Sequence, residues 1–542
     1  MKKFLRLFFG RVLVIIIALI LQLFAFSVIV LVVLMGAGVI ESFLASIVGD
    51  TFAAIIDQSL SYMLSAAQVI LTIVVSIYIV NSKVATSYKI TWLFVVGVLA
   101  FFGTILYLLF ANKSTNKRMR KRLEKEKSAL RRFEIDQKIE KELHNSAEDE
   151  SALSLANYVS KTSGQTLYKN SEVTYFKSGE DAWPFMLDEL SKAEHYIFLE
   201  YFIVEKGVFW DSLLEILEKK AKEGVDVRVM YDDLGSVSTL PVNYPKRLKK
   251  MGIKCVPFNR LRAFVNIKVN NRDHRKILVI DGKVGFTGGI NLADEYVNHI
   301  ERFGYWKDNS IRIKGEGVYG LTQLFLSNWL FSNNIDDTSE LFDDKYLPKT
   351  YKTKEDKINE SGYVQPYGDI PFDNDNIGQN VYLKLINGAR KYIYITTPYL
   401  IIDDEMNNAL CRAAMSGIDV HVMTPHIPDK KLVFGITRSH YAPLIKAGVK
   451  IHEFTPGFIH EKMFIVDDIY GTVGTINLDY RSLYLHLENG TFMYKCDCLK
   501  EMKQDYEDSI KVSELIDSNR YKKIKRGKGL WWGILRVFCP ML

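Results

Sequence analysis

The sequence of 542 residues predicts an α/β protein in which two tandem homologous halves form one unit, preceded by N-terminal transmembrane helices. Three observations predict this fold class. A motif of 18 residues occurs twice, from His274 and from His460, and the segments around the two copies repeat in the same order. The first 112 residues carry long apolar runs. A chain of this length exceeds a single core, so several domains are expected.

Residues 1–112 are predicted to be a membrane-spanning region of two or three helices. Val12–Met35 is almost entirely apolar, with one Gln, and Thr91–Ala111 is a second clear run; each is long enough to cross a bilayer. Met63–Val80 is weaker because it contains Ser, Gln and Thr. A cleaved secretory signal peptide is the alternative for the first run, but that run is longer than such a peptide needs.

The basic residues around these runs disagree about orientation. Lys2, Lys3, Arg6 and Arg11 favour a cytoplasmic N-terminus, and the ten Lys or Arg of Asn112–Arg132 favour a cytoplasmic position for the chain that follows. Two cytoplasmic ends require an even number of spans, whereas three apolar segments are present. The number of spans and the side of the N-terminus therefore stay open. The denser basic block predicts that the rest of the chain is cytoplasmic.

Two basic segments flank the repeated part of the chain. Residues 113–150 are charge-rich and are predicted to form a helical linker, either solvated or in contact with lipid. Residues 516–542 form a tail whose last part, YKKIKRGKGLWWGILRVFCPML, has six Lys or Arg and no acid. Basic residues beside Trp and aliphatic side chains suit an interfacial segment on anionic lipid. A buried C-terminal helix is the alternative for its apolar part.

The repeats predict a first half over residues 151–345 and a second half over residues 346–515. HYIFLEYFIV from His195 resembles KYIYITTPYLI from Lys391, and EGVDVRVMYDDLGS from Glu223 resembles SGIDVHVMTPHIPD from Ser416. Each half alternates short β-branched or aromatic runs with amphipathic stretches. This alternation is typical of βαβ units and of a mixed or parallel sheet.

The motif itself reads His-x-Lys-x4-Asp, and its two copies are His274, Lys276 and Asp281, and His460, Lys462 and Asp467. The His and Lys of one copy project from the same face of a β-strand. The first copy predicts a hairpin whose turn is Asp281-Gly282. We expect both Asp residues to fix the strand and to partner a base. Asn291 and Asn477 follow at matching positions.

Two histidines, two lysines and two amides suit the cleavage of a phosphodiester. One imidazole can attack phosphorus while the other protonates the leaving oxygen and later accepts a proton from the incoming nucleophile. We expect Lys276, Lys462, Asn291 and Asn477 to bind the phosphate oxygens. Since the lysines already supply positive charge, the sequence predicts no metal ion and no cofactor. The glycines after the first copy favour His274 as the nucleophile.

The chain resembles the phospholipase D superfamily and, within it, the bacterial cardiolipin synthases. Both motif copies carry the trailing Gly and Asn of that superfamily. The closer resemblance rests on NNRDHRKILVIDGKVGFTGGINLADEY, on YDDLGS and TPYL, and on GTINLDYRSLYLHLEN. The family pattern implies an acid downstream of each motif. Glu488 fits that place for His460, and Glu295 is the preferred acid in the first half, with Glu301 the alternative.

The resemblance implies transfer of a phosphatidyl group from one phosphatidylglycerol to another, through a phosphohistidine, at a bacterial cell membrane. The expected partners are therefore phosphatidylglycerol and anionic membrane lipid. A membrane-bound phospholipase D that passes the group to water is the alternative. A nuclease is disfavoured because membrane anchoring serves a lipid substrate, so no nucleic acid partner is expected. The sequence leaves the oligomeric state open.

Overall fold

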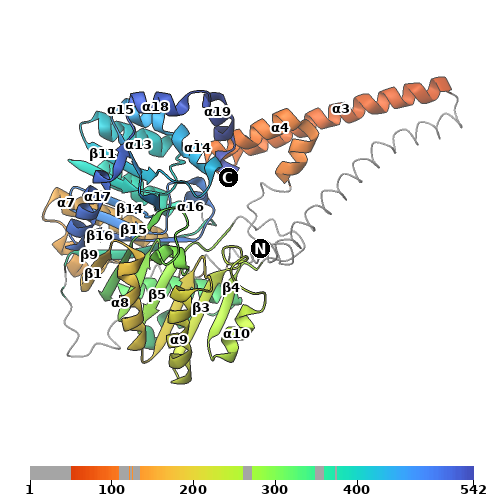
Figure 1. Ribbon diagram of the computed structural model, residues 1–542. Coiled ribbons are helices and arrows are strands. Elements are labelled where there is room, and N and C mark those ends of the chain that lie inside the picture. The colour runs from red at the N-terminus through yellow and green to blue at the C-terminus, as the bar shows by residue number, and fades with distance from the viewer. Residues whose placement is uncertain are drawn as a thin grey trace. The chain divides into compact units, whose positions relative to one another are not determined.

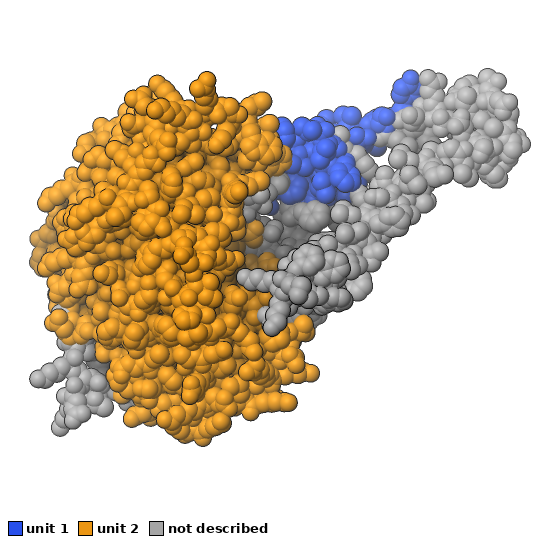
Figure 2. Space-filling view, viewed as in Figure 1, with its two compact units in different colours: residues 1–114, 261–269, 541 blue, residues 115–260, 270–540, 542 orange. Residues whose placement is uncertain are grey.

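The computed structural model describes residues 50–82, 84–108, 135–260, 271–347, 361–372 and 375–541, and also 121, 125, 128 and 359 (Figure 1). The chain divides into two compact units (Figure 2). One comprises residues 1–114, 261–269 and 541, and the other comprises residues 115–260, 270–540 and 542.

The described helices of the N-terminal unit are α3 (Asp50–Asn81) and α4 (Thr86–Leu106). They pack against each other, and Lys89 Nζ donates a hydrogen bond to the Val80 carbonyl at 2.8 Å. Much of their remaining surface is both apolar and exposed, including Val69, Ile73 and Val98. Such a surface is unusual for a protein that meets only water.

Within the described ranges, no helix combines the length and the apolar content needed to cross a membrane. The spans predicted at Met63–Val80 and Thr91–Ala111 are therefore not supported. The first lies in a helix that polar residues interrupt, and the second extends beyond α4, which ends at Leu106. The third predicted span, Val12–Met35, lies outside the described residues.

The large unit contains two mixed β-sheets with the same strand order. The first sheet has the order β1-β8-β6-β5-β2-β3-β4, and the second has the order β9-β16-β15-β14-β10-β11-β12-β17. In both sheets three parallel strands adjoin an antiparallel group, as the pairs β2–β3 and β2–β5 show for the first. The predicted duplication is therefore present in the fold, and β17 is the one strand of the second sheet without a counterpart among the strands of the first.

The bounds of the elements follow the sequence repeats. The strands are β1 (Ser171–Phe176), β2 (Tyr196–Tyr201), β3 (Asp226–Asp232), β4 (Lys254–Phe258), β5 (Lys276–Ile280), β6 (Val284–Gly288), β7 (Tyr305–Lys307), β8 (Ser310–Gly315), β9 (Tyr363–Asp369), β10 (Tyr392–Thr396), β11 (Asp419–Pro425), β12 (Lys450–Phe454), β13 (Gly457–Ile459), β14 (Met463–Val466), β15 (Tyr470–Gly474), β16 (Glu488–Tyr494) and β17 (Ser513–Leu515). The helices are α6 (Gln137–Glu142), α7 (Ala147–Ser163), α8 (Gly179–Ser191), α9 (Val208–Lys222), α10 (Tyr244–Lys250), α11 (Val318–Asn333), α12 (Ile377–Gly388), α13 (Asp404–Met415), α14 (Lys431–Ser439), α15 (Tyr441–Ala447), α16 (Tyr480–Tyr484), α17 (Cys498–Lys511), α18 (Ser518–Lys525) and α19 (Gly529–Val537). Short 3-10 turns are η3 (Asp294–Val297), η4 (Ser339–Phe342), η5 (Asp344–Tyr346) and η6 (Cys539–Met541).

One apolar core joins the two halves. It takes Phe198 and Ile277 from the first sheet, Met463 and Ile465 from the second, and residues of α11 and α17. The opposite face of the first sheet packs on α8, α9 and α10 around a separate cluster that includes Trp210. Sheets covered on both faces explain why strands such as β2, YIFLEY, are buried at every position.

The predicted hairpin is present in both halves. β5 pairs antiparallel with β6, and β14 with β15. Both central residues of each turn have positive φ, at Asp281 (51°) and Gly282 (63°), and at Asp467 (57°) and Asp468 (61°). Such turns match the right-handed twist of the paired strands, and Gly, Asn and Asp tolerate them best.

Candidate active site

Each motif histidine is attached to the opposite half through its main chain. The His274 N–H donates to the carbonyl of Leu487 at 2.8 Å, and the His460 N–H donates to the carbonyl of Lys307 at 2.7 Å. The short strands β7 and β13, one from each half, pair in parallel beside the second contact. The docking of the halves therefore places both motif strands at one interface.

The histidine side chains cross the same interface. Nδ1 of His274 lies 2.9 Å from Oε2 of Glu488, and Nδ1 of His460 lies 2.7 Å from Oδ2 of Asp308. Each carboxylate directly follows the residue whose carbonyl accepts from the histidine main chain. Because Nδ1 donates to a carboxylate, the lone pair of each neutral imidazole is on Nε2, which is the nitrogen left to meet phosphorus or a hydroxyl.

Both predicted supporting carboxylates need correction. Glu488 was predicted for His460, but it contacts His274. Glu295 was predicted in the first half, but its carboxylate accepts from Arg302 at 2.6 Å. The prediction was wrong because it paired each acid with the motif of its own half, whereas the halves exchange these acids.

Asp308 is the residue that the sequence prediction missed. It precedes Asn309 and β8 as Glu488 precedes Asn489 in β16, and the strand registers agree, since Gly288 pairs with Ser310 and Gly474 with Gly490. Aligning KDNS with LENG across the repeats would have located it.

The two motif lysines are buried, and each donates a hydrogen bond to the main-chain carbonyl of the histidine in its own motif. Lys276 Nζ donates to the His274 carbonyl at 2.7 Å. Lys462 Nζ donates to the His460 carbonyl and lies 2.8 Å from His460 Nδ1. Burial, together with the neighbouring Lys462, lowers the pKa of Lys276 to about 7, against the effect of Glu488. Burial lowers the pKa of Lys462 to about 8, against the effect of Asp308. Two ammoniums in one dry site favour a bound anion.

Burial keeps the imidazoles neutral, and the adjacent histidines keep the buried carboxylates ionised. It lowers the pKa of His460 to about 4 and that of His274 well below its ordinary value, although the carboxylates act in the opposite direction. The histidines hold the pKa of Glu488 and of Asp308 below the usual range despite burial. A neutral imidazole beside a fixed anion is the form that attacks phosphorus or removes a proton.

The two predicted asparagines differ in their surroundings. Asn291 uses both ends of its amide within the first half, accepting from the Ile203 N–H at 3.0 Å and donating to the Tyr296 hydroxyl at 2.9 Å. The side-chain oxygen of Asn477 is buried and has no hydrogen-bond partner in the described part of the chain. Of the two, Asn477 is thus the better placed to bind a hydroxyl of a ligand.

The motif aspartates bind the main chain. Asp281 accepts from the N–H groups of Glu194, His195 and Tyr196 at 2.7 to 2.8 Å. Asp467 accepts in the same way from residues 390–392 at 2.6 to 2.8 Å. Asp281 lies five positions after Lys276, which is about 16 Å along an extended chain. These contacts fix each hairpin to the start of the neighbouring strand of its sheet, β2 or β10, and the expectation that the aspartates also partner a base is wrong.

A third histidine lies beside Glu488. His486 Nδ1 is 3.6 Å from Glu488 Oε1, and its ring centroid is 5.6 Å from that of His274. Arg481 Nε donates to His486 Nε2 at 3.3 Å. His274, His486 and Glu488 offer ligand atoms within 4.8 Å of one another, a set that can bind a divalent cation. The spacing in sequence did not indicate this group.

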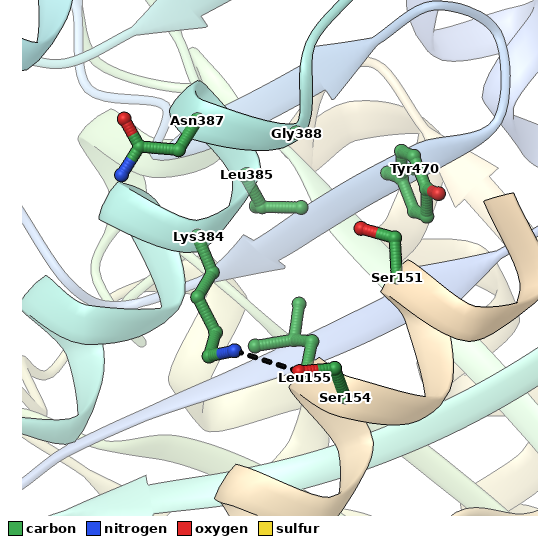
Figure 3. Close-up of a pocket in the computed structure, with 8 residues that line it drawn as sticks. All are labelled: Ser151, Ser154, Leu155, Lys384, Leu385, Asn387, Gly388 and Tyr470. Atoms are coloured by element: carbon green, nitrogen blue, oxygen red, sulfur yellow. Dashed lines mark hydrogen bonds between the residues drawn. The ribbon is translucent and has the colours of Figure 1, made fainter. Parts of the chain in front are cut away.

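A surface hollow elsewhere does not share these residues. It lies between α7 and α12, and Figure 3 shows Lys384 reaching across it to Ser154, with a hydrogen bond of 3.0 Å. Tyr470 lines the same hollow. None of the ten predicted site residues does, so it is separate from the candidate active site.

Comparison with known proteins agrees with this description. A family model described as "Cardiolipin synthase, PLD-like domain" matches twice, over residues 186–310 and 382–510. A Streptococcus mutans protein described as uncharacterized is 45% identical over 468 residues, which cover 86% of this chain and 99% of that protein. "Cardiolipin synthase 2" of Bacillus anthracis is 35% identical over 459 residues, 84% of this chain and 87% of the relative. The crystal structure of phosphatidylserine synthase from Haemophilus influenzae has a similar fold, with a TM-score of 0.53 at 15% identity, covering 73% of this chain and all 100% of that one.

Two domains of the phospholipase D type, each carrying one His-Lys-Asp motif, define the class of protein. The chain belongs to the cardiolipin synthase family. It is a phospholipid phosphatidyltransferase.

Proposed function

We propose that the protein transfers the phosphatidyl group of one phosphatidylglycerol to the terminal hydroxyl of a second, giving cardiolipin and glycerol. The observation that carries the proposal is the pair of buried imidazoles, each hydrogen-bonded to a carboxylate of the opposite half, with two lysines beside them. This arrangement supports a double displacement at a phosphodiester in which one chain supplies both histidines.

In the first step, Nε2 of His274 attacks phosphorus and the bond from phosphorus to the glycerol headgroup oxygen breaks. His460 donates a proton to that oxygen, and free glycerol leaves. The pKa of His460 is about 4 without ligand. A bound phosphate adds a negative charge beside it, which raises this pKa and lets His460 carry the proton.

In the second step, His460 accepts the proton of the incoming phosphatidylglycerol hydroxyl. The resulting oxygen forms a bond to phosphorus, and the bond from phosphorus to Nε2 of His274 breaks. Lys276 and Lys462 stabilise the charge on the non-bridging oxygens in both steps. The free amide oxygen of Asn477 can accept a hydrogen bond from a glycerol hydroxyl.

The alternative acceptor is water, which would make the protein a membrane-associated phospholipase D. Aromatic rings favour the lipid hydroxyl, because they cover the site and restrict water. Phe202 lies 4.9 Å from His274, and Tyr296 and Trp306 lie 5.4 Å and 5.6 Å from His460, between ring centroids. Purified protein supplied with phosphatidylglycerol alone in detergent tests the choice. Cardiolipin and free glycerol support transfer, whereas phosphatidic acid contradicts it.

We further propose that the protein works at the cytoplasmic face of a bacterial cell membrane. The exposed apolar side chains of α3 and α4, together with the basic residues of Asn112–Arg132, support contact with anionic lipid. Recovery in the membrane fraction, and protection of the large unit from protease added outside intact cells, are the expected results. Cleavage of that unit from outside would contradict the orientation.

A further inference from the structure

The C-terminal helix α19 is amphipathic, and one of its faces is fixed to the catalytic unit. Trp532 is 6% exposed and Leu535 is 9% exposed, and α19 packs on α14. A Cβ on Gly435 of α14 would lie 3.0 Å from Trp532 Nε1, so this glycine allows the indole to approach closely. α18 packs on α15, where the rings of Tyr441 and Tyr521 lie 6.3 Å apart.

The other face of α19 is apolar and exposed. Leu530 is 84% exposed, Trp531 is 57% exposed and Ile534 is 46% exposed. Leu432 of α14, the helix on which α19 packs, is 45% exposed as well. A helix that already has a buried face does not need a second apolar one for folding, so these side chains indicate an interaction surface.

Exposed cations directly precede this apolar face along the chain. Lys522, Lys523, Lys525, Arg526 and Lys528 are exposed, and none forms an ion pair with a residue in the described ranges. Residues 521–542 contain no Asp or Glu. Unpaired cations beside an exposed Trp and aliphatic side chains match a surface that is anionic at its boundary and apolar just below it, and a phosphatidylglycerol bilayer is such a surface.

We propose that this surface, formed by Leu432, Leu530, Trp531, Ile534 and the five cations above, docks the catalytic unit on an anionic lipid bilayer. The docking face inserts the apolar residues at the level of the headgroups, and the cations contact lipid phosphates. The proposal extends the proposed function by naming the surface that meets the substrate membrane, and it rests on that function only in requiring a lipid substrate.

The docking face is connected to the histidine site by a short path. α14 begins two residues after Asp429, whose carboxylate accepts from the Tyr399 hydroxyl at 2.6 Å. Burial and, to a smaller extent, the nearby Asp429 raise the pKa of both Tyr399 and Tyr296, and Tyr296 packs edge-on against His460. Contact of α14 and α19 with lipid therefore brings the His460 side of the site toward the membrane that holds its substrate.

Trp531 and Trp532 provide the test, because one is exposed and its neighbour is buried. The full chain is incorporated in vesicles of phosphatidylglycerol and phosphatidylcholine whose acyl chains carry bromine. Bromine quenches indoles that enter the bilayer, so the intact protein is expected to show a quenched component that is missing in Trp531→Phe and retained in Trp532→Phe. Equal quenching of the intact protein and Trp531→Phe would overturn the proposal. Equal quenching in pure phosphatidylcholine would overturn the requirement for anionic lipid.

Charge variants provide a second test with a matched control. Replacing Lys522, Lys523, Lys525 and Arg526 by Gln is expected to weaken the quenching of Trp531 so that at least tenfold more phosphatidylglycerol is needed. The control replaces Lys246, Arg247, Lys249 and Lys250 of α10, an identical change in charge at another exposed site. An equal effect of the control would overturn the assignment of the surface. Because neither readout involves catalysis, these experiments can refute the docking surface without refuting phosphatidyl transfer. Likewise, a failure of phosphatidyl transfer would leave the docking result unchanged.

Discussion

Replacing Asp308 by Asn tests the crossed arrangement of the site most directly. The carboxylate of Asp308 is fully buried and lies 2.7 Å from His460 Nδ1. Asn keeps the shape but removes the negative charge that orients the imidazole and stabilises its protonated form. A charge-assisted hydrogen bond contributes about 1.5–3 kcal/mol, and loss of the correct tautomer adds to this. We expect kcat to fall by roughly 10³ to 10⁴-fold.

Glu295→Gln is the matched control, because Glu295 is the acid that the sequence favoured and the structure pairs it with Arg302. It is expected to leave kcat within a few fold of the unchanged enzyme. The assay is the rate of cardiolipin formation from phosphatidylglycerol in mixed micelles, with the melting temperature measured to exclude unfolding. If Asp308→Asn were nearly as active as the unchanged enzyme while Glu295→Gln were inactive, the crossed assignment of the carboxylates would be refuted.

Three further outcomes are expected. His274→Ala and His460→Ala should each abolish turnover, and the double variant should be no worse than either single one, because the two act as one unit; an active single variant would contradict a two-histidine site. Since the folded-state pKa of Lys276 is about 7, below the ordinary 10.5, the folded state loses this proton first, so stability should rise with pH from about 7 to 10. Lys276→Met should reduce the rise with pH in the free energy of unfolding, as measured by urea unfolding at several pH values. It should also raise stability at pH 7 while removing activity, and an unchanged dependence of stability on pH would contradict the low pKa. Activity should survive EDTA, whereas added Zn²⁺ should inhibit by binding His274, His486 and Glu488, and His486→Asn should weaken that inhibition; Zn²⁺ sensitivity that is unchanged in this variant would exclude the site.

Much of the fold could be predicted because the information is local or repeated. The hairpin at Asp281 follows from alternating strand residues and from a turn that needs positive φ, both readable within ten residues. The finding that both sheets share one strand order follows from the order of the repeats. Because His and Lys two residues apart share one face of a strand, their joint placement could also be anticipated.

The crossed carboxylates could not be predicted in the same way. Which acid meets His460 depends on how the two halves dock, and that docking is decided by an apolar core collected from both sheets and from α11 and α17. No short-range pattern encodes a contact between residues separated by 152 or 214 positions. The sequence within one half therefore favoured Glu295, which lies at a suitable distance along the chain but contacts Arg302 in the structure.

The exchange of carboxylates also constrains how this chain can change over generations. In each half, the motif histidine depends on a carboxylate from the other half. A substitution at Asp308 therefore alters His460, and one at Glu488 alters His274. A duplicated gene normally frees one copy to diverge, but here each copy supplies an indispensable part of the other's chemistry. The two halves therefore cannot diverge independently, because loss of the carboxylate in either half inactivates the histidine of the other.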